Sequence, residues 1–200
     1  ITASLLFVLI LPFISAEQIG ILEAPQTAKW NKTDLTYTIN NFHSDMSEVD
    51  TRNAIRRAFA LFSNASALTF NEVASGGDIK FEFLNIDDKE ENIISQNYPP
   101  GHGKINFDTK DKWTVMKKDH LPVETHYDFL TTAIRSIAFT LGLKRSQSDQ
   151  SILSKYQSNP VNSKGVYVVP KLDEEAIKEL QRLYGERVDV VRYKPAEQPY

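Results

Sequence analysis

Side chains that could bind a metal or catalyse a reaction are scarce in this chain. It has no cysteine and four histidines, and no two histidines lie four residues apart, as paired zinc ligands on a helix do. Ser136 could act as a nucleophile only with a histidine base and an orienting acid, and the sequence gives no local sign of either. We expect His43, His102, His120 and His126 to be ordinary polar residues. The alternative is a new zinc site built from His120 and His126.

One acidic run could attract a cation. Asp87, Asp88, Glu90 and Glu91 stand within five residues, and carboxylate oxygens are ligands that calcium prefers. Such a run could hold calcium weakly. On composition alone, however, we expect a solvated acidic loop.

Length and composition indicate one compact domain. The chain has 200 residues, of which 41% are hydrophobic, and a formal net charge of −3. It has no run of five or more basic residues, so we expect no nucleic-acid partner. With no cysteine, stability must come from the core or from metals.

The N-terminus predicts secretion. An apolar run over residues 5–14 is followed by the small residues Ser15 and Ala16, as in a cleaved signal peptide. The run is too short for a membrane helix, which needs roughly 20 apolar residues. We therefore predict a signal peptide over 1–16 and no membrane attachment after cleavage; an uncleaved anchor is the alternative. Two N-x-S/T sequons, at Asn31 and Asn64, fit glycosylation on this route.

Hydrophobic periodicity predicts the elements that would position any site. An extended N-terminal arm over 17–28 precedes them, and a C-terminal tail over 186–200 follows. Alternating β-formers predict strands over 35–39, 68–73, 79–83 and 104–107. Polar residues predict a long surface loop over 85–104. Apolar stripes predict helices over 47–63, 124–141 and 173–184, the first and last of which have Ser47 and Asp173 as caps.

Four stretches, in order, carry a family resemblance. They are Lys29–Tyr37 (KWNKTDLTY), Ala58–Phe70 (AFALFSNASALTF), Asn106–Asp108 with Trp113-Thr114, and Leu183–Gly185 (LYG). Together they resemble the catalytic domain of a matrixin, the matrix-metalloproteinase branch of the metzincins. The resemblance covers 29–185 and implies an α+β fold: a twisted, mostly parallel five-stranded sheet with three helices.

The zinc-binding helix of that family is altered here. The metzincin motif is H-E-x-x-H-x-x-G-x-x-H. By this resemblance its three histidine positions are Arg135, Phe139 and Arg145, and its glutamate position is Ser136, while Gly142 is retained. Arginine and phenylalanine have no lone pair to give to zinc, and a lone serine hydroxyl is too weak a base. We therefore expect neither catalytic zinc nor a catalytic base.

Two other family features differ as well. The H-F-D histidine of the structural zinc site is Asn106, and the Met-turn methionine is Leu153. A leucine can still fill the floor of the site as a hydrophobic side chain, which would preserve the fold without the metal.

The two arginines admit two interpretations. Arg135 and Arg145 could form an anion pocket where the resemblance places zinc. They could instead point outward or pair with local acids such as Asp149. The second interpretation is favoured, because most arginines have no ligand role.

The sequence thus predicts a secreted, monomeric, non-catalytic matrixin-like protein that binds an extended peptide or extracellular protein in the old substrate cleft. Strand addition uses main-chain hydrogen bonds and needs no zinc. The first alternative is the activity that the family alone implies, that of a zinc metalloendopeptidase of the extracellular matrix. The second is a structural secreted protein with neither activity nor peptide ligand.

Overall fold

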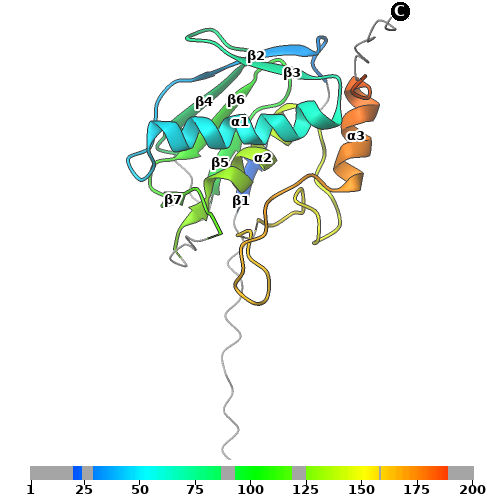
Figure 1. Cartoon of the computed structure of the whole chain (residues 1–200). Coiled ribbons are helices and arrows are strands. Elements are labelled where there is room, and N and C mark those ends of the chain that lie inside the picture. The colour runs from blue at the N-terminus through cyan, green and yellow to red at the C-terminus, as the bar shows by residue number, and fades with distance from the viewer. Residues whose placement is uncertain (1–19, 24–28, 87–92, 119–124, 158, 189–200) are drawn as a thin grey trace, which may run out of the picture.

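The computed structural model describes residues 20–23, 29–86, 93–118, 125–157 and 159–188 (Figure 1). The predicted signal peptide, the acidic run at 87–91, His120 and most of the predicted C-terminal tail lie outside these residues.

A single six-stranded sheet organises the fold. Its order is β1-β5-β6-β4-β2-β3, and only the β5–β6 pair is antiparallel. The mostly parallel sheet and the three helices confirm the predicted fold class. Five of the strands come from the predicted domain, 29–185, and β1 adds a sixth. The strands are β1 (Gly20–Glu23), β2 (Asp34–Ile39), β3 (Thr69–Glu72), β4 (Ile79–Leu84), β5 (Ile93–Asn97) and β6 (Lys104–Asp108). The short strands β7 (Trp113–Thr114) and β8 (Tyr127–Asp128) pair separately.

Two of these strands correct the sequence-based prediction. Residues 93–97, expected within a surface loop, form β5, and residues 20–23 of the expected arm form β1. The buried positions of β5 include Ser95 and Asn97, which are 0% and 1% exposed. Because polar side chains fill buried positions, β5 lacks the alternation of apolar and polar residues that marks a half-buried strand.

The helices are α1 (Glu48–Ala65), α2 (Phe129–Thr140) and α3 (Glu174–Tyr184). Ser47 caps α1 as predicted, since its hydroxyl accepts a hydrogen bond from the Asp50 amide at 3.0 Å. The start of α2 was predicted too early. Asp128 caps this helix by accepting a hydrogen bond from the Thr131 amide at 2.8 Å. Asp128 and the residue before it, Tyr127, form β8.

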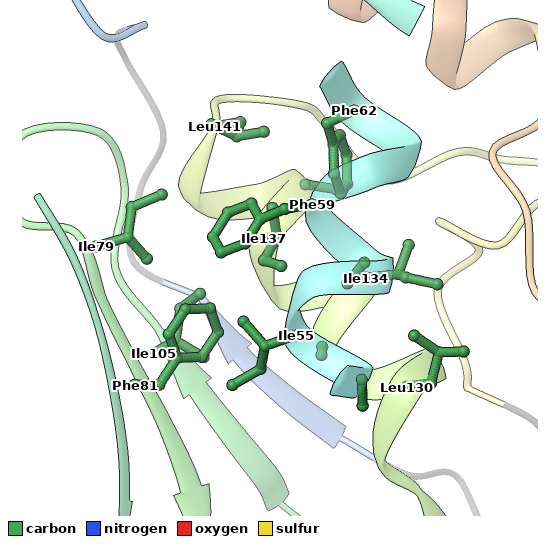
Figure 2. Packing of buried hydrophobic residues seen from close by; sticks show 14 of the residues in the cluster. Ile55, Phe59, Phe62, Ile79, Phe81, Ile105, Leu130, Ile134, Ile137 and Leu141 are labelled. Atoms are coloured by element: carbon green, nitrogen blue, oxygen red, sulfur yellow. The ribbon is translucent and has the colours of Figure 1, made fainter. Parts of the chain in front are cut away.

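Helices α1 and α2 pack against one face of the sheet (Figure 2). The stripe predicted for α1 is buried there, and the α2 stripe lies beside it. Burying one such side chain contributes about 1.5–3 kcal/mol. The interface makes α2 a fixed support for the residues that follow it. Its members include Ile55, Phe59 and Phe62 of α1, Ile134 and Ile137 of α2, and Ile79, Phe81 and Ile105 of the sheet.

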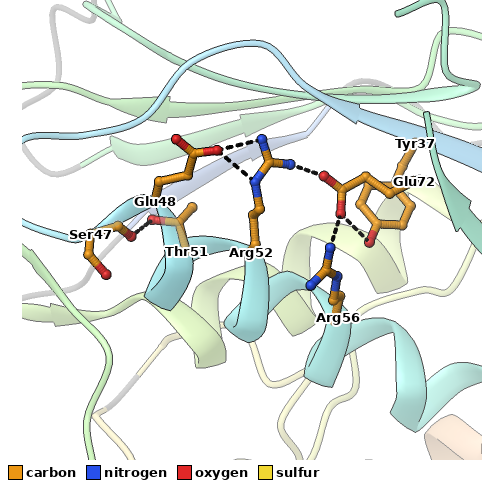
Figure 3. Close-up of polar contacts among 7 residues, drawn as sticks. All are labelled: Tyr37, Ser47, Glu48, Thr51, Arg52, Arg56 and Glu72. Atoms are coloured by element: carbon orange, nitrogen blue, oxygen red, sulfur yellow. Dashed lines mark hydrogen bonds and ion pairs between the residues drawn. The ribbon is translucent and has the colours of Figure 1, made fainter. Parts of the chain in front are cut away.

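A charged network ties α1 to the sheet edge (Figure 3). Arg52 forms ion pairs with Glu48 of its own helix and with Glu72 of β3. Arg56 pairs with the same Glu72 at 2.9 Å, and the hydroxyl of Tyr37 donates to it at 3.3 Å. The shared carboxylate thus holds β3 against α1.

The start of the 29–185 region is anchored to the ends of α2 and α3. The Trp30 indole N–H donates to the Thr140 carbonyl at 3.0 Å, and the Trp30 amide donates to the Tyr184 hydroxyl at 3.1 Å. The Lys29 ammonium donates to the Leu183 carbonyl at 2.6 Å. These contacts fix where the chain enters the domain, at Lys29, which five residues separate from the end of β1.

Candidate functional site

The site begins where α2 ends in a tight turn. Gly142 has φ of 99°, a conformation that glycine adopts without strain. The Gly142 amide donates to the Phe139 carbonyl, and the Leu143 amide donates to the Ala138 carbonyl, both at 2.9 Å. This reverses the chain and carries residues 143–157 back past α2.

Arg135 is the central side chain of the site. It projects from α2, and only 5% of it is exposed. Its guanidinium donates to the Ile152 carbonyl and, at 2.7 Å, to the Ser154 carbonyl. The buried charge therefore cross-links α2 to the loop that follows it.

Arg145 holds the same loop from the other side. Its guanidinium donates to the Ser154 carbonyl at 3.3 Å and to the Lys155 carbonyl at 2.9 Å. Together with the buried Phe139, the two arginines border a space of about 10 Å³. A cavity needs roughly 10–15 Å³ to hold one water molecule. Each guanidinium group donates two hydrogen bonds to backbone carbonyls of the loop.

Ser136 faces the sheet and not the loop. It is fully buried, and its hydroxyl oxygen lies 3.5 Å from that of Ser95 on β5. The side-chain amide of Asn97 donates to the same Ser95 hydroxyl at 3.4 Å. Ser136 is therefore part of a buried polar contact between α2 and β5.

Leu153 lies in the main hydrophobic core and is 7% exposed. The loop around it is held by Asp173, the N-cap of α3, which accepts from the Ser151 hydroxyl at 2.5 Å and from the Ile152 amide at 3.3 Å. Burial acts to raise the pKa of Asp173, but these hydrogen bonds and one from the Ala176 amide outweigh it and hold that pKa below its usual value. The carboxylate thus ties the loop to α3.

Asn106 has a cross-strand partner that sequence reasoning missed. The side-chain amide of Asn106 on β6 donates to that of Gln96 on β5 at 3.4 Å. The two residues are directly opposed in the β5–β6 pair. Gln96 could not be singled out from the sequence, because its segment was predicted to be a surface loop and not a strand.

One of the described histidines lies close to an acid: Nδ1 of His43 is 3.6 Å from the Asp45 carboxylate. His43 is 8% exposed, and its ring contacts the Thr109 carbonyl at 3.2 Å and the Asp45 amide at 3.2 Å. His102 is exposed, and His126 is half-buried beside Thr125. Within residues 20–23, 29–86, 93–118, 125–157 and 159–188, no three His, Cys, Asp or Glu side chains are arranged to hold a metal ion.

Strand β5 borders α2 and carries an added strand on its outer side. Residues Gly20–Glu23 pair with it in parallel, with Ile21 opposite Ser95 and Glu23 opposite Asn97. This edge of the sheet therefore accepts an extended segment through main-chain hydrogen bonds. In Figure 1 β1 lies at the edge of the sheet beside β5.

Two cavities flank the loop 146–157. One, of about 420 Å³, lies against Arg135 and is walled by Pro160, Val161 and Val168. The other, of about 870 Å³, lies between Arg145 and the first turns of α3.

The two sequon asparagines are both exposed: Asn31 precedes β2 and Asn64 lies near the end of α1. Across the ranges that the structure describes, no helix is both long enough and apolar enough to cross a membrane.

The fold is that of a metallopeptidase-like α+β domain, and the comparisons give the family. The matrixin family model matches residues 29–185. Matrix metalloproteinase-C of Caenorhabditis elegans is 32% identical over 182 residues, covering 83% of this chain and 31% of that protein. Interstitial collagenase of Oryctolagus cuniculus is 34% identical over 133 residues, covering 61% and 27%. Neutrophil collagenase of Homo sapiens is 28% identical over 177 residues, covering 83% and 35%.

The chain belongs to the matrixin family. It spans about a third of the length of these relatives, 31%, 27% and 35%.

Proposed function

We propose that this matrixin is a secreted, non-catalytic protein that binds an extended peptide along strand β5. The single observation that carries the proposal is the position of Arg135, whose buried guanidinium bonds to the loop carbonyls at Ile152 and Ser154.

The chemistry of the side chains supports the absence of a catalytic zinc. Zinc in such a site takes three electron-pair donors and one water. A guanidinium offers only N–H donors and a fixed positive charge, and phenylalanine offers no donor. The space of about 10 Å³ beside Arg135, Phe139 and Arg145 is also small for a metal with its water. Arg135, Phe139 and Arg145 are therefore unsuited to hold a catalytic zinc ion.

The position of Ser136 supports the absence of a base. A general base must reach the proton it takes, at about 2.6–3.2 Å, and must have a suitable pKa. The Ser136 side chain is fully buried against Ser95 and bears no basic group. No hydrolytic step is assigned to it.

Peptide binding is supported by the edge of β5. Backbone pairing with β1 demonstrates that this edge can take an added strand. We propose that a partner peptide takes the place of Gly20–Glu23, so that β1 competes with it. An intramolecular competitor acts at an effective concentration of the order of millimolar, so tight binding requires β1 to leave.

Two alternative functions differ from this proposal. The names of the relatives, a matrix metalloproteinase and two collagenases, favour an active metalloendopeptidase. A structural role without ligand is the second alternative. Calcium at the acidic run 87–91, glycans on Asn31 and Asn64, secretion through residues 1–16 and a monomeric state are further proposals.

Zinc content and proteolysis decide between the first two functions. The purified chain is expected to hold far less than one zinc per molecule and to leave casein and gelatin intact with or without a chelator. One tightly held zinc per chain with chelator-sensitive cleavage would establish the peptidase and refute the proposal.

A proline variant of β1 tests peptide binding. Alternate residues of an edge strand direct their N–H groups to the partner strand, so I21P combined with L22P removes a pairing N–H in either register. Screened on arrays of extended peptides, this variant is expected to bind at least roughly tenfold more tightly than the unmodified chain. A control, A24P, alters the chain outside β1. Equal binding by all three would refute strand replacement at β5, and no binding by any of them would favour the structural role.

A further inference from the structure

Exposed apolar side chains are concentrated in one short segment. Seven large hydrophobic residues are exposed among the described residues, and five of them lie between 156 and 169. The valines at 161, 166, 168 and 169 are 40%, 48%, 47% and 61% exposed, and Tyr156 is 37% exposed. Clustered apolar exposure marks interaction sites more often than scattered exposure does.

These valines are carried by an internally bonded hairpin, residues 159–169, here called the valine hairpin. The Val168 amide donates to the Pro160 carbonyl at 2.8 Å, and the Asn162 amide donates to the Val166 carbonyl at 2.9 Å. The Asn162 side chain also accepts from the Val166 amide at 3.0 Å. In Figure 1 this hairpin, in yellow-orange, projects from the body of the fold. Its apolar side chains are therefore presented on an ordered backbone.

The valine hairpin is attached to the body through its base. The Asn159 side-chain amide donates to the His126 carbonyl at 3.1 Å, and its oxygen accepts from the Asp128 amide at 3.2 Å. An ordered, anchored surface loses little conformational entropy on binding, which favours affinity.

The chain segment that contains the valine hairpin carries only basic charges. Between residues 155 and 171 the sequence has three lysines and no aspartate or glutamate, although the whole chain has a net charge of −3. Lys155, Lys164 and Lys171 are all exposed. The nearest acids outside the segment include Asp173, which is occupied by Ser151 and by the amides of Ile152 and Ala176. Asp149 is exposed beside the adjoining cavity.

We propose that the valine hairpin and its three lysines form a docking surface for an acidic protein segment that carries aliphatic side chains. The aliphatic groups cover the valines, and the carboxylates face Lys155, Lys164 and Lys171. Complementary charge selects the partner and speeds association, while the covered apolar area gives affinity. The surface is separate from the β5 edge and does not rest on the proposed function.

The probe is a fluorescein-labelled twelve-residue peptide of alternating Glu and Leu, titrated onto the purified chain by fluorescence anisotropy. Alternating Glu and Ser, and alternating Lys and Leu, are the peptide controls. The Glu-Leu peptide is expected to bind, and more weakly in high salt, because salt screens exposed charges. Comparable binding of the Glu-Ser peptide overturns the proposal, since the valines would then contribute nothing.

Two sets of variants locate the surface. Changing the four valines to threonine preserves side-chain shape and branching, and is expected to weaken Glu-Leu binding at least roughly tenfold. V49T, at an exposed valine of α1, is its control. K155Q with K164Q and K171Q should weaken binding to a similar degree, and K178Q on α3 should not. Unchanged circular dichroism and melting temperature verify folding; unchanged binding by either set overturns the proposal.

Two further measurements separate this surface from other occupants. The I21P/L22P variant is expected to bind the Glu-Leu peptide as the unmodified chain does, and a gain would assign that peptide to β5 and overturn the proposal. Vesicles of phosphatidylcholine with phosphatidylserine test a lipid surface. Valine-dependent vesicle binding without peptide binding would make an anionic membrane the occupant, against the proposal.

Discussion

The guanidinium of Arg135 donates a hydrogen bond of 2.7 Å to the carbonyl oxygen of Ser154, nineteen residues further along the chain. This contact joins the middle of α2 to the loop beneath it through a side chain that is 5% exposed. A buried charge is costly unless it is hydrogen-bonded. The carbonyls of Ile152 and Ser154 supply that compensation.

The first prediction concerns the stability that this contact provides. R135M keeps the apolar stem but removes both Arg135 hydrogen bonds, and it leaves the Ser154 carbonyl with the weaker contact from Arg145 at 3.3 Å. We expect a loss of about 2–4 kcal/mol in the free energy of unfolding, measured by urea denaturation. R145M, at a half-buried position, should cost about 1 kcal/mol. A loss below about 0.5 kcal/mol for R135M would contradict a structural role.

The sequence singled out Arg135 as a residue of the site but did not predict its hydrogen-bond partners. The two interpretations of Arg135 and Arg145 were an anion pocket, or side chains that point outward or pair with acids such as Asp149. The observed acceptors are the backbone carbonyls of Ile152, Ser154 and Lys155. Every residue has a carbonyl, so side-chain identities carry no signal for this arrangement.

The fold was more predictable than the site, because long apolar stripes are strong signals. The stripe through Ile55 and Phe62 located α1, and Asp173 with Gly185 located α3. The start of α2 was predicted at residue 124, but the helix begins at Phe129, after its N-cap Asp128. Strand β5 was missed because Ser95 and Asn97 occupy buried positions.

The second prediction tests whether the four side chains at the motif positions determine zinc binding. R135H, S136E, F139H and R145H together introduce the family motif. The three new histidines stand at positions that border one small space. This variant is expected to bind about one zinc per chain, measured by elemental analysis, and to melt at a lower temperature after chelation. The unmodified chain, treated alike, should show no change on chelation. A folded variant without zinc would mean that the loop geometry also differs from that of a zinc site.

A third prediction follows from Asp173. Its folded pKa lies below the unfolded value, so its stabilising effect is present above the unfolded pKa of about 3.9 and is lost as pH falls through the folded pKa. The unmodified chain should therefore lose stability below about pH 4 more steeply than D173N, which cannot ionise. Thermal melts from pH 3 to pH 7 measure the difference. The same slope in both proteins would show that Asp173 is not the linked group.

The last prediction concerns the buried Tyr184 hydroxyl, which accepts from the Trp30 amide at 3.1 Å and donates to the Leu141 carbonyl at 2.5 Å. Y184F removes the hydroxyl and should cost about 1–3 kcal/mol of folding stability, because it leaves that amide and carbonyl without this partner.

Burial raises the pKa of Tyr184 to about 12, from 10.0 when unfolded. Because the unfolded chain ionises first, this hydroxyl favours folding below pH 10 and loses that effect as pH rises toward 12. In ultraviolet titration of phenolate, Y184F should lack one late-ionising tyrosine, whereas Y98F, at a half-buried tyrosine, should retain it. If Y98F lost the late-ionising step and Y184F kept it, the raised pKa would not belong to Tyr184.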